Sequence, residues 1–402
     1  MITKISNINK VVSYDIKKKD IVSFSPNYIL IKNGIIENIG FDEINNENID
    51  NSIDANNNIL TPGFIDSHTH LIFSSNRSKD FSKRISGKSY IDIANSGGGI
   101  KSSIKSLRET SSDLIIDKCM KEINNFIKNG TTTIEAKSGY GLSLLDEIRS
   151  LEIIKRLNNL SDIDLIPTFM GAHDFPEDVK DRSSYVDLIC EEMIPEITSR
   201  NLAEFCDIFY EKGYFDKNQT IKIVNQAINY GLDMKLHVDE FEDSDGAYLA
   251  AEINAISADH LMHSNQNGLK HMAEKNVAAT ILPGTTLFLG LDTYANGRKI
   301  IDYGCSLAIA SDYNPGSNTI YSLPIIMALS CLYCGISINE AFKAVTYNAA
   351  KAINRGEDIG IIKENYNADL LFWDIENVYE IPYWFNTERL FRVVKKGQLV
   401  DL

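Results

Sequence analysis

The sequence predicts an α/β protein: a (β/α)8 barrel of the TIM type with a small β domain formed by both termini. Three observations support this prediction. Apolar strand-like runs alternate with helix-like stretches through the middle of the chain, and both ends carry short strands joined by tight turns. The chain has 402 residues, of which 44% are hydrophobic, so it can fill a barrel of roughly 250 residues and a smaller domain as well.

The two ends of the chain read as β-hairpins. Near the N-terminus, Asn33-Gly34 separates two apolar runs, Tyr28–Ile31 and Ile35–Ile39, and Asn-Gly between such runs is a strong hairpin signal. Near the C-terminus, a strand at Asp369–Trp373 precedes a second hairpin around Lys396-Gly397. We therefore place residues 1–61 and 360–402 in one small sheet domain and residues 62–359 in the barrel.

The middle of the chain contains eight strand-like runs, each followed by a helix-like stretch or a loop, as a parallel barrel requires. An open doubly wound sheet is the alternative, but no Gly-x-Gly-x-x-Gly turn follows an early strand. Gly97-Gly98-Gly99 follows polar sequence, which indicates a flexible loop. The eight runs are Gly63–His70, Thr131–Ala136, Leu165–Gly171, Cys206–Tyr210, Met234–Val238, Ala255–His260, Ala278–Leu282 and Ser306–Ser311.

Composition narrows the possible partners and compartments. The net charge of -15 disfavours binding to nucleic acid or anionic membranes. The N-terminus shows no secretory signal, and the apolar segment Ile325–Ile336 is too short to span a bilayer, so we expect a buried helix there. Six scattered cysteines favour a reducing, cytoplasmic compartment, with Cys331 and Cys334 as core residues one helical turn apart.

Histidines at strand ends are the sharpest chemical signal. His68 and His70 are two residues apart, so on a strand both imidazoles point to the same face, at the end where barrel enzymes place their sites. His237 and His260 end two later strands, and Asp312 follows the eighth. Together they indicate a mononuclear divalent metal site. The alternative is a set of core histidines satisfied by local hydrogen bonds, and we expect His263 and His271 to be surface or supporting groups.

This constellation resembles the amidohydrolase superfamily. The resemblance implies a (β/α)8 barrel with a small β-sandwich from both termini. It also implies that His68, His70, His237 and Asp312 ligate one metal, Zn²⁺ or Fe. Binuclear members carry a bridging lysine at the end of strand four, but Cys206–Tyr210 contains none and the next lysine is Lys212. One metal is therefore favoured, and Lys137 is interpreted as a structural ion-pair residue.

Several blocks are similar to one family in particular, the imidazolonepropionases. They are residues 62–73 with Asn76-Arg77, and residues 96–100, 135–142, 171–173, 237–240 and 311–317. The resemblance implies hydrolysis of the cyclic amide of 4-imidazolone-5-propanoate to N-formimidoyl-L-glutamate, in histidine degradation. It implies that Glu240, His260 and Asp312 act in catalysis. It assigns substrate binding to Arg77, Tyr90, Tyr140, His173, Glu240, Asn314, Gly316 and Ser317.

Two other functions stay open at this point. Another mononuclear amidohydrolase, such as a cytosine or guanine deaminase, would use the same metal with ammonia as the leaving group. Arg77 and the turn at Asn314–Ser317 favour a substrate with a carboxylate arm instead, although Asn-Pro-Gly is also ordinary turn chemistry. A non-catalytic scaffold would be expected to lack metal ligands. A homodimer is the expected assembly.

Overall fold

The computed structural model describes residues 1–42, 49–88, 92, 97–385 and 388–401. Its centre is a sheet of eight strands in the order β8 to β15, and every neighbouring pair is parallel. The strands are β8 (Phe64–Thr69), β9 (Thr131–Lys137), β10 (Asp164–Ala172), β11 (Phe205–Tyr210), β12 (Asp233–Val238), β13 (Ser257–His260), β14 (Ala278–Ile281) and β15 (Leu307–Ile309). All eight predicted runs are confirmed as strands.

The sheet closes on itself where the last strand meets the first. The Asp312 amide donates to the carbonyl of His68 at 3.0 Å, and the His70 amide donates to the carbonyl of Tyr313 at 2.9 Å. This junction joins the segment after β15 to β8, so the sheet forms a barrel. The doubly wound alternative is therefore wrong.

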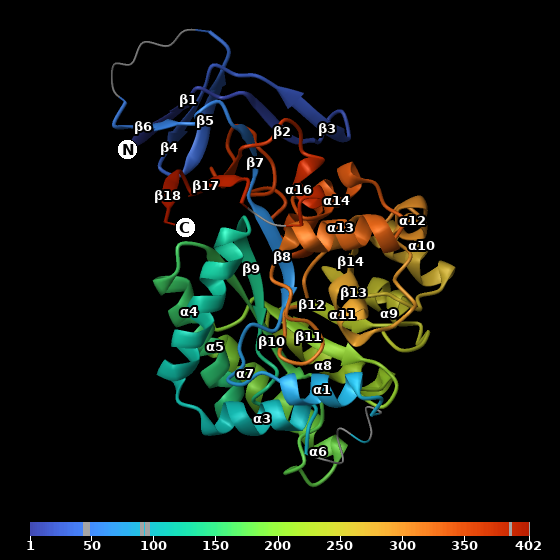
Figure 1. Ribbon diagram of the computed structural model, residues 1–402. Coiled ribbons are helices and arrows are strands. Elements are labelled where there is room, and N and C mark those ends of the chain that lie inside the picture. The colour runs from blue at the N-terminus through green and yellow to red at the C-terminus, as the bar shows by residue number, and fades with distance from the viewer. Residues whose placement is uncertain (43–48, 89–91, 93–96, 386–387, 402) are drawn as a thin grey trace.

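Helices surround the barrel (Figure 1). Their starts follow local capping chemistry: Asp216 and Gln219 form a capping box at the start of α8, whose buried residues Ile223, Val224 and Ala227 lie on one face. The helical elements are α1 (Ser78–Ile85), α3 (Ile100–Glu109), α4 (Ser112–Lys128), α5 (Leu144–Leu160), α6 (Arg182–Leu188), the π-helix η1 (Ile189–Met193), α7 (Ile194–Ser199), α8 (Lys217–Asn229), α9 (Gly246–Glu252), α10 (Gln266–Lys275), α11 (Pro283–Leu289), α12 (Gly297–Asp302), α13 (Leu323–Tyr333), α14 (Ile338–Ala344), α15 (Tyr347–Ala352) and α16 (Glu380–Tyr383).

The terminal strands form two sheets, in agreement with the small β-sandwich that the resemblance implied. The first has the order β5-β4-β1-β6 and uses N-terminal strands alone, whereas the second has the order β18-β17-β16-β7-β2-β3 and uses both ends of the chain. One apolar cluster with side chains from both sheets, including Ile29, Ile53, Leu60 and Phe372, lies between them. The arrangement is a sandwich at one end of the barrel (Figure 1).

Both predicted hairpins are confirmed within these sheets: β4 pairs with β5 and β17 with β18, each antiparallel. At the turns, Asn33 with Gly34 and Lys396 with Gly397 have positive φ angles. The terminal strands are β1 (Ile2–Ser6), β2 (Lys10–Asp15), β3 (Asp20–Phe24), β4 (Tyr28–Lys32), β5 (Ile35–Gly40), β6 (Asn51–Asp54), β7 (Ile59–Pro62), β16 (Leu370–Trp373), β17 (Leu390–Lys395) and β18 (Gln398–Val400).

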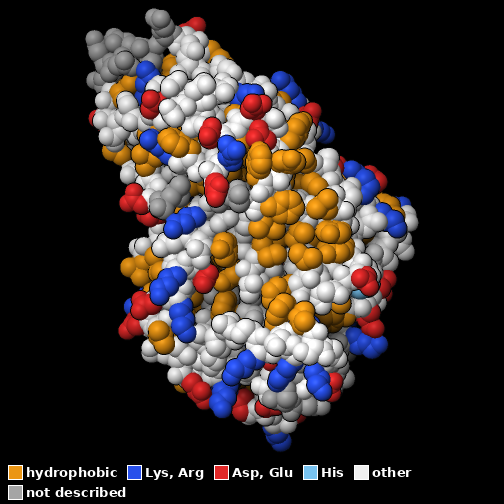
Figure 2. Space-filling view, in the orientation of Figure 1, with side chains coloured by type: hydrophobic (Ala, Val, Ile, Leu, Met, Phe, Trp, Pro, Cys, Tyr) orange, Lys and Arg blue, Asp and Glu red, His pale blue; other side chains and the backbone are white. Residues whose placement is uncertain are grey.

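The predicted apolar helix is α13, and most of its residues are buried. Cys334 is buried in the main apolar cluster and half-buried Cys331 packs against it, as expected of packing residues. Among the described residues, no helix has the length and apolar character needed to cross a membrane. Hydrophobic side chains gather on the face shown in Figure 2 over the region of α13 and α16, where Leu332, Tyr333, Tyr379 and Tyr383 are exposed.

Candidate metal centre

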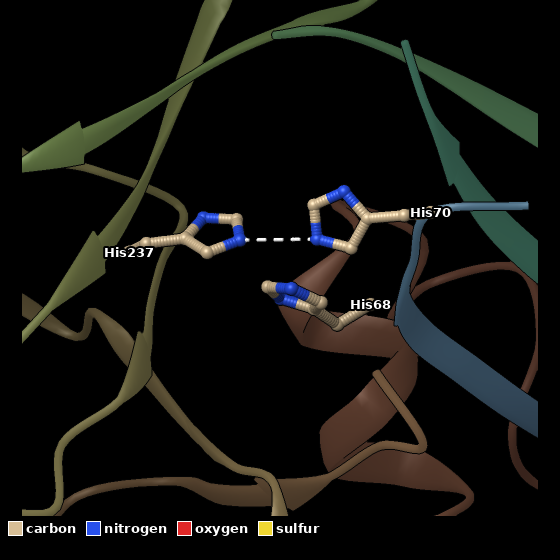
Figure 3. A group of neighbouring side chains, drawn as sticks. All are labelled: His68, His70 and His237. Atoms are coloured by element: carbon tan, nitrogen blue, oxygen red, sulfur yellow. Dashed lines mark hydrogen bonds between the residues drawn. The ribbon is translucent and has the colours of Figure 1, made fainter. Parts of the chain in front are cut away.

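Three histidines meet at the C-terminal mouth of the barrel (Figure 3). His68 is on β8 and His70 directly follows it, and both imidazoles face the interior because residues i and i+2 of a strand share a face. His237, on β12, brings its Nε2 atom to 3.3 Å from Nε2 of His70. One potential ligand atom from each of the three histidines lies within 4.8 Å of the others.

Asp312 completes the group from the loop after β15. Its Oδ1 atom is 3.7 Å from Nε2 of His68 and 3.5 Å from Nε2 of His70. The loop is fixed by the barrel-closing hydrogen bonds, and Thr285 donates a hydrogen bond of 2.5 Å to Oδ2. Burial raises the pKa of Asp312 to about 6. The four residues proposed as metal ligands from the sequence therefore converge on one place.

The free atoms of this group fit a divalent transition metal. His68 is fully buried, yet its Nε2 atom has no hydrogen-bond partner, which is costly unless another group satisfies it. Burial lowers the pKa of both His68 and His70 well below the usual value, so these imidazoles stay neutral and keep a lone pair for a metal. Three imidazoles with one carboxylate suit zinc or iron.

Neither Lys137 nor Lys212 is placed as the bridging lysine of a site with two metals. Lys137 is fully buried and lies 2.8 Å from Glu135 Oε1 and 2.7 Å from Asp207 Oδ2. Lys212 is exposed and pairs with Glu242 at 3.0 Å. The predicted structural ion pair of Lys137 is therefore confirmed, and Lys212 faces solvent rather than the histidines.

His260 and Glu240 form a pair beside the three histidines and Asp312. His260 Nε2 lies 3.6 Å from Glu240 Oε2, and the His260 ring centre is 5.2 Å from that of His237. Burial and the neighbouring Asp312 raise the pKa of Glu240 well above its usual value. A carboxyl in this condition can hold a proton and deliver it. His263 is exposed, and His271 pairs with Glu252 and Glu274 at the surface, as expected.

A cavity of about 580 Å³ opens over the histidines. It brings together most of the residues proposed for substrate binding, namely Arg77, Tyr140, His173, Glu240, Asn314 and Ser317. Gly316 lies against the guanidinium of Arg77, where any Cβ atom would overlap it. Tyr90 lies outside the described residues. Asp80 lies 3.5 Å from Arg77 Nε and accepts a hydrogen bond of 2.8 Å from the Gly99 amide.

The side chain of Asn314 forms hydrogen bonds within the turn itself. Its Oδ1 atom accepts from the amides of Gly316 and Ser317, both at 2.8 Å, and its Nδ2 atom donates to the carbonyl of Asp312 at 2.7 Å. The plain-turn interpretation of this segment is thus supported for the side chain of Asn314. The turn also ties Arg77, through the contact with Gly316, to the loop that carries Asp312.

The sequence interpretation missed several residues of this cavity. Arg84, on α1, lines the same cavity as Arg77, and its guanidinium lies over the rings of Phe81 and Phe288. Arg84 follows Arg77 by seven residues, and two helical turns place such residues on one face, so the spacing could have indicated it. An aromatic group formed by Phe209, Tyr214 and Phe241 also lines the cavity. Phe209 is on β11, Tyr214 follows β11 and Phe241 follows β12, and no local motif marks them.

Comparisons with known proteins agree with this geometry. A family model described as the amidohydrolase family matches residues 218–400. Imidazolonepropionase of Geobacillus sp. (strain WCH70) is 42% identical over 379 residues, which cover 92% of this chain and 89% of that protein. Imidazolonepropionase of Alkaliphilus oremlandii (strain OhILAs) is 43% identical over 342 residues, which cover 85% of this chain and 81% of that protein.

Solved structures with the same fold are more distant in sequence. A guanine deaminase from C. acetobutylicum, with bound guanine, has a TM-score of 0.73 at 16% identity and covers 100% of both chains. A 5-methylcytosine deaminase from Klebsiella pneumoniae has a TM-score of 0.74 at 15% identity and covers 99% of this chain and 97% of that one. These likenesses show the barrel and sandwich fold alone. With relatives above 40% identity over most of its length, the chain belongs to the imidazolonepropionase family of amidohydrolases.

Proposed function

We propose that this chain hydrolyses the cyclic amide of 4-imidazolone-5-propanoate to N-formimidoyl-L-glutamate, a step of histidine degradation. The observation that carries the proposal is one cavity that combines the histidine group with the cationic side chains of Arg77 and Arg84. The histidine group can serve hydrolysis, and the two arginines can bind the carboxylate arm of a substrate. The relatives above 40% identity carry the name of this activity.

His68, His70, His237 and Asp312 would hold one divalent ion, Zn²⁺ or Fe. Such an ion, when bound, lowers the pKa of a water molecule toward about 7 and so makes it a nucleophile at neutral pH. The unpartnered Nε2 of His68 and the short Nε2–Nε2 distance between His70 and His237 support this ligand set.

The remaining groups move protons and stabilise charge. Water adds to the ring carbonyl carbon, the carbon–nitrogen bond of the ring breaks, and the ring nitrogen takes up a proton. We assign the first acceptance of the water proton to the Asp312 carboxylate and its delivery to the ring nitrogen to Glu240. His260, beside Glu240, stabilises the negative charge that develops on the carbonyl oxygen. Burial around Glu240 favours the protonated carboxyl that this delivery requires.

The cavity has a cationic side for the propionate arm. Arg77 and Arg84 provide two positive charges and Asp80 one negative charge, so the local balance suits a single carboxylate. Tyr140 and His173, whose ring centres are 5.3 Å apart, form the adjoining wall. We assign substrate contacts to these residues, to Tyr90 and to the turn at Asn314, Gly316 and Ser317.

A turnover assay tests the proposal. Purified protein loaded with Zn²⁺ or Fe²⁺ should form N-formimidoyl-L-glutamate from 4-imidazolone-5-propanoate and release no ammonia from guanine or cytosine. Asp312→Ala should abolish turnover, because it removes both a metal ligand and the proton acceptor. Activity on the bases instead would support the deaminase alternative. Full activity in the Asp312→Ala variant would overturn the mechanism.

We also propose that the chain acts in the cytoplasm as a homodimer. All six cysteines are free thiols, which is typical of a reducing compartment. The exposed apolar residues of the α13–α16 face support the dimer. Four half-exposed large side chains there supply roughly 400 Å², about half of what one partner of a standard interface buries. Sedimentation velocity should show twice the monomer mass in the wild type and the monomer in Tyr383→Lys. A wild-type monomer would contradict this proposal.

A further inference from the structure

Two of the proposed metal ligands are each bonded to a buried aspartate. His237 Nδ1 lies 3.0 Å from Asp207 Oδ1, and His68 Nδ1 lies 2.6 Å from Asp259 Oδ2. Asp207 is on β11 and Asp259 on β13, the two strands that flank β12. Both carboxylates are fully buried, and neither has a role in the mechanism above.

Each aspartate in turn lies near a buried lysine. Lys137 Nζ, on β9, is 2.7 Å from the second oxygen of Asp207. Lys235 Nζ, on β12, is 3.8 Å from Asp259 Oδ2 and donates to Ser257 Oγ at 2.7 Å and to the carbonyl of Ala352 at 3.0 Å. A lone buried carboxylate is costly, so each lysine offsets the charge of the aspartate that contacts a histidine.

We propose that Asp207 and Asp259 are positioning residues that fix His237 and His68 in the tautomer and orientation a metal requires. When Nδ1–H donates to a carboxylate, the lone pair of Nε2 is left for the metal, and the ring cannot rotate away. Nε2 of His237 faces Nε2 of His70 (Figure 3), and Nε2 of His68 lies 3.7 Å from Asp312 Oδ1. This inference rests on the metal ligation in the proposed function.

His70 is held by a different means, which makes the inference specific. Its Nδ1 atom is buried without a hydrogen-bond partner, and its ring stacks on that of His173 with centres 4.9 Å apart. Substitution of Asp207 or Asp259 should therefore loosen one ligand each and leave His70 in place. The cationic side of the cavity, with Arg77 and Arg84, is built from other elements and should keep its affinity for substrate.

The test is the Zn²⁺ affinity of the apoprotein, measured by competition with a chromophoric chelator. Asp207→Asn and Asp259→Asn should each weaken Zn²⁺ binding by roughly 10- to 100-fold. With saturating Zn²⁺, KM should stay close to that of the wild type while kcat falls. The isosteric amide keeps the packing but cannot provide the full negative charge that the histidine N–H contacts.

Asp369→Asn is the matched control. Asp369 is also a buried carboxylate paired with a buried lysine, Lys395 at 2.7 Å, but it lies at the start of β16 in the terminal sheet. The Asp369→Asn substitution should lower the melting temperature and leave Zn²⁺ affinity unchanged. Should one of the two site variants fail to fold, the other tests the same inference.

The outcomes separate this inference from the function on which it rests. Zn²⁺ affinities of both site variants within twofold of an active wild type would overturn it, as would an equal loss of affinity in Asp369→Asn. A wild type that binds no Zn²⁺ and no Fe²⁺ would instead overturn the proposed function. Weaker Zn²⁺ binding in the site variants alone supports the positioning role.

Discussion

Gly316 has no Cβ atom, and this leaves room for the side chain of Arg77 at the edge of the cavity. A Cβ atom there would overlap the guanidinium of Arg77, which lines the cavity and would have to move away from the turn. Gly316→Ala should therefore displace Arg77 and raise KM roughly 10- to 100-fold, the loss of a charge-assisted contact, with little change in kcat. Steady-state kinetics measure this. In an Arg77→Met background, Gly316→Ala should cause no further rise in KM. An additive rise in KM would show that Gly316 acts on another group.

At the scale of single residues, the sequence indicates the proposed metal ligands but not the aspartates that contact them. Two-residue periodicity on a strand is a local property, so His68 and His70 could be assigned to one face. The contacts of Asp207 and Asp259 depend on how neighbouring strands align, for instance His237 opposite Phe209 and Asp259 opposite His237. No local pattern states that alignment. The sequence predicts an ion pair for Lys137 but does not identify its partner, for the same reason.

The loop between β9 and α5 depends on one carboxylate. Glu147 is fully buried, and its Oε1 atom accepts from the amides of Gly139, Gly141 and Leu142 at 2.8 to 3.2 Å, which surround Tyr140. Glu147→Ala should lower the free energy of unfolding by about 1–3 kcal/mol for each amide left unsatisfied, and should raise KM because Tyr140 moves. Glu147→Gln keeps one acceptor oxygen and should have a smaller effect. Thermal melts and kinetics measure both, and equal effects would contradict this account.

Elements with a strong local signal were predicted, and those set by distant partners were not. Asn33-Gly34 specifies its hairpin because both residues tolerate the positive φ angles of a tight turn. The division of the terminal strands into two sheets carries no such signal. β6 and β7 are neighbours in sequence, yet they join different sheets after a turn in which Asn56 and Asn57 have positive φ angles. Burial between the sheets decides which strands pair.

For the whole molecule, the count of eight strands predicted the barrel, because eight parallel strands in sequence close around one core. The attachment of the terminal sheets was not predictable, since it rests on side chains far apart in sequence. We propose that the domain limits remain those expected, residues 1–61 with 360–402 and residues 62–359. Across this boundary, Lys395 on β17 contacts Asp164 at 2.9 Å and Thr133 at 3.3 Å, at the N-terminal ends of β10 and β9.

Two adjacent lysines allow the strength of that attachment to be measured. Lys395 is 5% exposed and pairs with Asp369 and Asp164, whereas Lys396 is 49% exposed and pairs with Asp164. Burial lowers the pKa of Lys395, but both carboxylates outweigh it and raise the pKa above its usual value, so the amine stays charged.

Lys395→Met should lower the free energy of unfolding by about 3–5 kcal/mol because it leaves a buried carboxylate unpaired. Lys396→Met should cost about 0–1 kcal/mol. Urea unfolding at neutral pH measures both, and equal losses would show that the buried contact does not hold the sheets to the barrel. Turnover at low temperature should be unchanged in either variant, because both lysines lie at the end of the barrel opposite the histidines.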